Sequence, residues 1–291
     1  HEPAVARGAN LRMKREAFHG LWPLKYKKDR WTVVRLRLAP GEGGLIMPHR
    51  PGGTTTPAAL AQAMMKAKKQ APPGFTVLLE PPFVVVGNDD PKMVKRFAAG
   101  TVRWTVARLR KAYFKRDPLE VIIVWLLKDE ASYHAASRRL FDGRLPGTPY
   151  GFYSRDKKLM LMNIATGGGT LVHELVHPFI EANFPNCPSW FNEGLGSLYE
   201  QSSTRDGHIV GLTNWRLAGL QRLIRAGRLP SIRVLTATTT RQFYENEDSD
   251  YYAFARYLMY YLQQRKVLRS YYHEVIKRQR SDPSGYKTLK R

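Results

Sequence analysis

The spacing of apolar residues along the chain predicts strands first and helices afterwards. Alternating apolar positions predict a strand over residues 31–38. Short apolar runs predict two strands on either side of Pro81 and Pro82, and two more over residues 119–127 and 158–164. After residue 164 nearly the whole chain has helical spacing. This order of elements indicates an α+β fold.

Three helices are predicted between these strands. The first covers residues 57–70 and lies between Pro57 and a Pro-Pro pair at Pro72. The second begins at Asp90, which can cap it, and continues to about residue 114. The third covers residues 130–140. The segment "GRLPGTPYGFY" after it has the composition of a loop.

The composition is that of a globular protein. Of the 291 residues, 43% are apolar and 11% aromatic, which argues against disorder. No apolar run approaches the ~20 residues of a membrane span, so no transmembrane segment is expected. One cysteine, Cys187, excludes an internal disulfide. We expect an exported bacterial protein, periplasmic or secreted, with a cytoplasmic location as the alternative.

The net charge of +23 is unusually large. Such a charge attracts nucleic acid, anionic cell envelopes and acidic substrates. The basic residues are spread along the chain, however, and no nucleic-acid-binding motif is present. We therefore expect non-specific affinity for anionic polymers or the envelope at most, and no sequence-specific binding of nucleic acid. A solvated basic surface without a dedicated partner is the simpler alternative.

The segment "HELVH" carries the strongest chemical signal. Residues i and i+4 of a helix share a face, so His173 and His177 would direct two imidazoles at one ion. Glu174 is placed to act on a water rather than on the metal, as in the zinc motif HExxH. Thr170 is the expected cap of this helix, and Pro178 is expected to kink it. The motif also occurs by chance, and a catalytic zinc needs a third protein ligand.

Glu193 in "WFNEG" is the candidate for the third ligand. The proline-rich turn "NFPNCPSW" precedes it, and a second helix then begins, with Ser189 as its expected cap. Two antiparallel helices joined in this way would return Glu193 to the two histidines. Gly194 and Gly196 would allow the helices to pack closely.

The two motifs together resemble the gluzincin clan of zinc metallopeptidases, which includes thermolysin and the aminopeptidase N group. The segment "LVHELVHPFIEANFPNCPSWFNEGLGSLYE" is most similar to bacterial peptidase-MA-like proteins. The similarity is firm over residues 150–200 and weaker over residues 75–272. Residues 1–70 resemble no family that we recognise.

The resemblance implies hydrolysis of peptide bonds in a peptide or protein substrate. His173, His177 and Glu193 would bind one catalytic Zn²⁺, and Glu174 would be the general base for a zinc-activated water. Two other functions stay open. The chain could be a non-catalytic zincin-fold protein that binds partners of the cell envelope. It could also be a binder of anionic polymers in which the zinc is only structural.

One position departs from the gluzincin pattern. Thermolysin-like enzymes have an aspartate four residues after the ligand glutamate, where it orients a histidine, and this chain has Ser197 there. A shorter group would hold the imidazole less firmly. Glu200, seven residues after Glu193 on the same helix face, is the candidate replacement.

The resemblance also implies a zincin-like fold over residues 75–291. A small mixed sheet with helices would lie above a mostly helical lower subdomain, with the zinc helix at the floor of the cleft between them. In related folds the strand before that helix is an edge strand, here residues 158–164, to which a peptide could add in extended form. Residues 1–74 form a basic N-terminal segment of unclear independence.

Hydrolysis also needs a donor for the negative charge that develops on the carbonyl oxygen. A neutral tyrosine, with a pKa near ~10, meets this need. Tyr252 is our candidate, and relatives with this pattern often place a tyrosine downstream of the ligand helix. Tyr251 is the alternative, because neighbouring residues on a helix point about 100° apart. Arg256 comes next, and a place in the core is the competing interpretation for both tyrosines.

Overall fold

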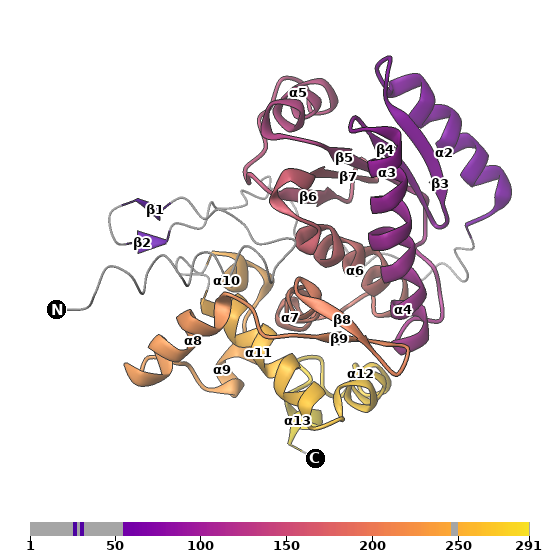
Figure 1. The fold of residues 1–291 in the computed structure, drawn as a ribbon. Coiled ribbons are helices and arrows are strands. Elements are labelled where there is room, and N and C mark those ends of the chain that lie inside the picture. The colour runs from indigo at the N-terminus through magenta and orange to yellow at the C-terminus, as the bar shows by residue number, and fades with distance from the viewer. Residues whose placement is uncertain (1–25, 28–29, 32–54, 246–249, 291) are drawn as a thin grey trace.

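The computed structural model describes residues 26–27, 30–31, 55–245 and 250–290 of the chain. These residues form an α+β fold with a five-stranded sheet in the upper part of Figure 1 and a mainly helical lower part. The predicted strand 31–38 lies outside the described residues apart from Trp31. That residue belongs to the two-residue strand β2 (Arg30–Trp31), which pairs with β1 (Tyr26–Lys27).

The main sheet is small and mixed, as predicted, and has the strand order β3-β4-β5-β7-β6. Strands β4, β5 and β7 are parallel, whereas β3 and β6 lie antiparallel at the two edges. The bounds are β3 Thr76–Glu80, β4 Phe83–Gly87, β5 Ile122–Leu127, β6 Gly151–Ser154 and β7 Leu159–Asn163.

Both faces of the sheet are covered by helices. Helices α2 (Pro57–Gln70) and α5 (Glu130–Leu140) cover one face, where Val84 and Val86 of β4 point. Phe83 and Val85 point to the other face and pack with the helices there. Because neither face meets water, the three parallel strands are buried along their whole length and appear in the sequence as continuous apolar runs.

Helices α2 and α5 have the bounds that the sequence predicts. Thr56 caps α2 by accepting a hydrogen bond from Ala59, and Asp129 caps α5 in a reciprocal arrangement with Ser132. Helix α2 precedes residue 75 and buries Ala67 against the sheet. At least this part of the segment 1–74 therefore packs together with the sheet.

The long helix predicted from Asp90 is present but interrupted. Asp90 caps α3 (Pro91–Phe97), as predicted, through a hydrogen bond from Lys92. Residues Ala98–Arg103 then form wider, π-helical turns (η1), and α4 (Trp104–Ala112) completes the helix. This composite helix lies on the same side of the sheet as α6 (Gly169–Asn183).

The lower part is helical except for one hairpin. The prediction of nearly continuous helix after residue 164 is wrong for β8 (Ser202–Arg205) and β9 (His208–Gly211), which pair antiparallel. Asp206 and Gly207 connect them, and both have positive φ, which an Asp-Gly hairpin turn requires. The helices are α7 Ser189–Tyr199, α8 Arg216–Arg225, α9 Ile232–Thr236, α10 Thr240–Tyr244, α11 Asp250–Gln264, α12 Leu268–Lys277 and α13 Tyr286–Leu289.

The predicted edge strand is wrong. Strand β7, which corresponds to residues 158–164, lies between β5 and β6, and the edge is formed by β6. Strand β6 arises within the segment that its Gly and Pro content assigned to a loop. The short chain reversal at residues 155–158 lets this segment pair back onto β7 and cover its open side.

Both predicted serine and threonine caps in the ligand helices are also wrong. Helix α6 begins at Gly169, before Thr170, and no side chain caps it. A side chain at Gly169 would collide with the carbonyl oxygen of Glu200, so this position suits glycine. Ser189 is the first residue of α7 rather than its cap, and its hydroxyl donates to Thr240. Helix α6 continues through Pro178 to Asn183.

No helix in the described parts of the chain is both long and apolar enough to cross a membrane.

Candidate metal centre

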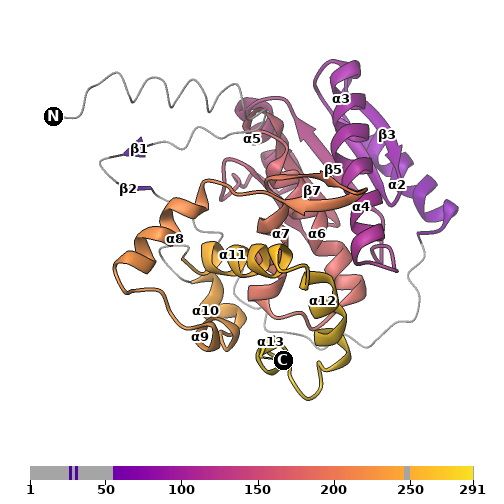
Figure 2. The same cartoon turned by 60° about the horizontal axis from the view of Figure 1, so that its bottom comes forward.

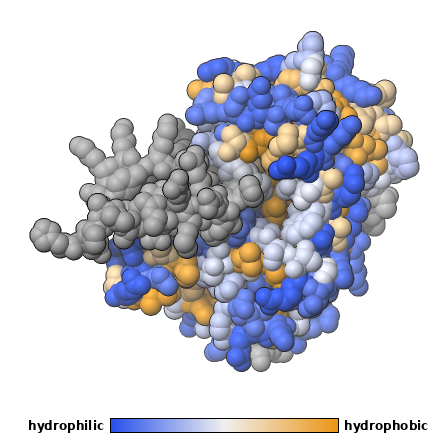
Figure 3. All heavy atoms as spheres, in the orientation of Figure 1, coloured by the Kyte–Doolittle hydropathy of each residue, from blue (hydrophilic) through white to orange (hydrophobic). Residues whose placement is uncertain are grey.

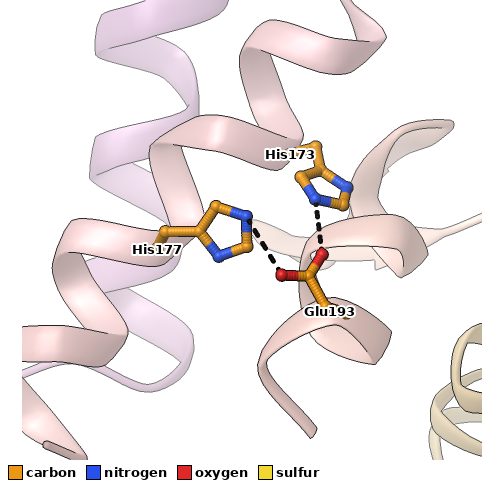
Figure 4. A group of neighbouring side chains, drawn as sticks. All are labelled: His173, His177 and Glu193. Carbon is orange, nitrogen blue, oxygen red and sulfur yellow. Dashed lines mark hydrogen bonds and ion pairs between the residues drawn. The ribbon is translucent and has the colours of Figure 1, made fainter. Parts of the chain in front are cut away.

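Two packed helices bring His173, His177 and Glu193 together (Figure 4). The histidines come from α6 and the glutamate from α7, and the three side chains are at most 9% exposed. A side chain at Gly196 would lie 3.2 Å from the imidazole of His173. At Gly194 it would lie 3.0 Å from the carbonyl oxygen of Ala255 in α11. The predicted close packing of α6 on α7 is therefore confirmed at Gly196, whereas Gly194 allows close contact with α11 instead.

The ligand atoms of these three residues converge. Oε2 of Glu193 lies 3.1 Å from Nε2 of His173, and its Oε1 lies 3.9 Å from Nε2 of His177. Figure 4 shows the carboxylate between the two rings, with one oxygen toward each. One ligand atom from each residue lies within 4.8 Å of the others. This spacing is compact enough for the three side chains to share one ion.

Each imidazole has a polar partner at its second nitrogen. Nδ1 of His177 lies 2.9 Å from Oδ1 of Asn192, and because this oxygen can only accept, Nδ1 donates the hydrogen. Nδ1 of His173 lies 3.3 Å from Oε1 of Glu200, at ion-pair distance but without hydrogen-bond alignment. Outer partners of this kind fix the ring orientation of metal-binding histidines. They leave Nε2 of both rings directed at Glu193.

Charge and donor type both fit a divalent cation. The largely buried carboxylates of Glu174, Glu193 and Glu200 face Arg216, whose guanidinium lies 2.9 Å from Glu200, and Arg256 adds positive charge near Glu200. With neutral histidines, His173, His177 and Glu193 together carry one negative charge, which a divalent cation would neutralise. Two imidazoles and a carboxylate are also a donor set that zinc prefers.

The pKa values reflect the same electrostatics. Burial lowers the pKa of His173, but the carboxylates of Glu193 and Glu200 outweigh it and raise the pKa to about 10. Burial raises the pKa of Glu193, and the two histidines more than compensate and lower it to about 2. The site therefore stabilises positive charge between these groups, and a metal would have to displace the proton of His173.

Residues 167–282 match the model of a family described as a protein of unknown function (DUF1570). The match covers less than half of the chain and includes α6, α7 and α11, and with them every residue of the candidate site named so far. A comparison with curated proteins gave no match.

Glu174 lies beside the ligand group and against the edge of the sheet. Its Oε2 is 3.9 Å from Nε2 of His177. Burial raises the pKa of Glu174, whereas the two histidines and the backbone N–H of Tyr153 in β6 lower it, and the net shift is upward. A buried carboxyl with a raised pKa next to a cation site has the properties of a general base.

Tyr244 contacts the site directly, although no sequence pattern pointed to it. Its hydroxyl donates to Oε1 of Glu193 at 2.5 Å, from the end of the short helix α10. Burial and the charge of Glu193 raise the pKa of Tyr244 well above its usual value, so the hydroxyl stays neutral and can donate. No periodic pattern links residue 244 to the ligand helices, because only the fold brings α10 to α7.

Tyr252 lies beside the site. Burial raises its pKa strongly, the charge of Glu193 adds to the rise, and the charge of Arg216 opposes it. Its ring packs on Tyr244 and under the guanidinium of Arg216. Tyr251 points elsewhere, since its ring stacks on Phe243 and lines a cavity of 420 Å³ with residues of α9 and α10.

The remaining candidates have other contacts. The hydroxyl of Ser197 is buried and makes no hydrogen bond to a described residue, so its predicted role beside the imidazole stays a prediction. Glu200 takes the place near His173 instead. Arg256 donates to the carbonyls of Ser197, Leu198 and Leu212, where it caps the end of α7. Its Nε and Nη2 therefore hold the end of α7, whereas Nη1 makes no hydrogen bond to a described residue.

Removing the Tyr244 hydroxyl is expected to weaken metal binding without unfolding the chain. Tyr244→Phe deletes only the donor to Oε1 of Glu193 and keeps the ring that packs on Phe243 and Tyr252. Outer partners of metal ligands are typically worth ~10- to 100-fold in affinity. Competition with a zinc chelator measures the change, and Tyr261→Phe, at an exposed position of α11, is the control. Unchanged zinc affinity in Tyr244→Phe would show that the hydroxyl does not support the ligand.

Proposed function

We propose that the chain is a zinc-dependent metallopeptidase of zincin-like fold that hydrolyses peptide bonds. The observation that carries the proposal is the convergence of His173, His177 and Glu193 with Glu174 beside them. The resemblance of both motifs to gluzincin peptidases supports it. His173, His177 and Glu193 would hold the ion, which in such sites acts as a Lewis acid and lowers the pKa of a bound water to about 7.

Glu174 has the proton-transfer role in this proposal. It takes a proton from the attacking water and passes it to the nitrogen of the leaving amine. A carboxyl whose pKa is raised by burial is a better proton acceptor than a solvated one, and it can return the proton in the second step. Asn192 and Glu200 keep the two imidazoles oriented during both steps.

No described strand pairs with the outer edge of β6, and this edge suits an extended substrate. Asn163 donates its N–H to the carbonyl of Tyr150, which makes these two residues a hydrogen-bonded pair of the antiparallel ladder. Alternation along the ladder then directs the backbone groups of Gly151 and Tyr153 away from β7. The N–H of Tyr153 reaches Glu174, so a peptide added along β6 would pass the proposed base.

Tyr252 and Tyr244 are two neutral donors beside the ligand group that could face the charge that develops on the carbonyl oxygen. We keep Tyr252 as the oxyanion donor, because the hydroxyl of Tyr244 is occupied by Glu193. Tyr252→Phe is expected to lower kcat by roughly 10- to 1000-fold with little change in zinc content. Tyr251→Phe is the matched control and should have normal turnover. If Tyr251→Phe alone is impaired, the donor is Tyr251 instead.

Zinc-dependent hydrolysis of a quenched fluorescent peptide library tests the proposal. The chain is stripped with a chelator, assayed, and assayed again after one equivalent of zinc is restored. We expect hydrolysis only with zinc. Retention of peptides without cleavage in the zinc-loaded chain would instead support a non-catalytic zincin-fold binding protein.

A further inference from the structure

The segment between the β8–β9 hairpin and α11 contains no acidic residue over positions 207–244, and six arginines fall within it. Two of these arginines are committed elsewhere, since Arg216 pairs with Glu200 and Arg241 pairs with Glu245. Arg222, Arg225 and Arg233 are exposed and have no acidic partner among the described residues. The segment therefore presents positive charge to solvent that no described residue neutralises.

Exposed apolar side chains are concentrated in the same segment. Eleven large apolar residues are exposed in the described part of the chain, and five of them lie between residues 212 and 234. Ile224 and Val234 are 55% and 48% exposed. Figure 3 shows hydrophobic residues directly beside strongly hydrophilic ones at the lower left, where Figure 1 places α8 and α9. Several strongly exposed aliphatic side chains in one region of a folded protein indicate a contact surface.

Both kinds of side chain occur around the end of α8 and the start of α9. Helix α8 ends at Arg225 and α9 begins at Ile232, and the turn between them is short. We define the α8–α9 surface as six of the exposed residues around this corner, namely Arg222, Ile224, Arg225, Ile232, Arg233 and Val234. Apolar residues hold the other sides of both helices in the core, including Leu220, Leu223 and Leu235.

We propose that the α8–α9 surface binds the headgroup region of an anionic lipid bilayer. The arginines would pair with lipid phosphates, and the branched aliphatic side chains would enter the boundary between headgroups and acyl chains. Charge alone would suit any polyanion, but the exposed Ile and Val residues gain free energy only from an apolar partner. A bilayer supplies both, and the proposal does not depend on the peptidase function.

Co-sedimentation of the full chain with phospholipid vesicles tests the proposal. The triple variant R222Q/R225Q/R233Q is expected to bind phosphatidylcholine vesicles that contain phosphatidylglycerol roughly 100-fold more weakly, at about fivefold per arginine. K92Q/K95Q/R96Q on α3 is the matched control. It removes three exposed basic side chains that have no acidic partner among the described residues and lie far from α8 (Figure 2). It should bind nearly as well as the unmodified chain.

A second variant separates the bilayer from soluble polyanions. I224S/I232S/V234S should bind the anionic vesicles more weakly but be retained on heparin like the unmodified chain. Three results would overturn the proposal: no binding to anionic vesicles by the unmodified chain, equal losses in the two charge variants, or vesicle binding that ignores the apolar substitutions. Circular dichroism and thermal unfolding confirm that each variant is folded.

Discussion

Glu174→Gln is expected to keep the fold and the metal but to lower kcat by ~10²-fold or more, the usual cost of a lost general base. The amide has the shape of the carboxyl but cannot accept the proton of the attacking water. Because the three ligands are other residues, zinc content should stay near that of the unmodified chain. Turnover of a quenched peptide and zinc analysis on the same sample measure both quantities.

Glu274→Gln is the matched control for this substitution. Glu274 lies on the surface of α12, where it pairs with Lys277, and the change to an amide is chemically the same. It should leave turnover unaltered. Normal turnover in Glu174→Gln would exclude the proposed proton transfer, and loss of zinc from this variant would mean that Glu174 is itself a ligand.

Glu193→Ala is expected to lower zinc affinity by more than ~100-fold, because outer partners alone are worth 10- to 100-fold. The substitution removes the only carboxylate among the described residues that lies within 4 Å of Nε2 of both histidines, and it leaves the Tyr244 hydroxyl without its acceptor. Peptide hydrolysis should fall in parallel at limiting zinc and recover partly at high zinc. Competition with a chromophoric chelator measures the affinity.

Glu274→Ala serves as the control here, since it removes an exposed carboxylate far from the ligands. Thermal unfolding of both variants separates lost metal binding from lost structure. If Glu193→Ala binds zinc as tightly as the unmodified chain, the third ligand is a different residue. Glu200, near His173, would then be the next candidate.

Features with a local signal were predicted well from the sequence. Helices α2 and α5 begin and end at the predicted residues because prolines or a capping aspartate bound them. The shared face of His173 and His177 follows from helix geometry alone. The return of Glu193 depended on the second motif, and Gly196, which lets α7 approach His173, is visible in the sequence.

Features that depend on contacts between distant segments were not predictable in this way. Strand β6 is short and follows Gly and Pro residues, so only its pairing with β7 makes it a strand. Tyr244 reaches the site because α10 packs on α7, and Arg216 reaches it because α8, which packs on α11, begins beside Glu200. Neither residue has a distinctive neighbour in sequence. Asn192 could have been recognised, since it precedes the ligand glutamate on a helix that faces His177.

X-ray absorption spectroscopy of the purified chain, loaded with one equivalent of zinc, tests the central claim most directly. The account predicts one tightly bound zinc per chain, whose nearest neighbours are two imidazole nitrogens and oxygen atoms, without sulfur. His173→Ala should reduce the imidazole count. A first shell that contains the sulfur of Cys187, fewer than two imidazoles, or zinc that a mild chelator removes at once would contradict the account.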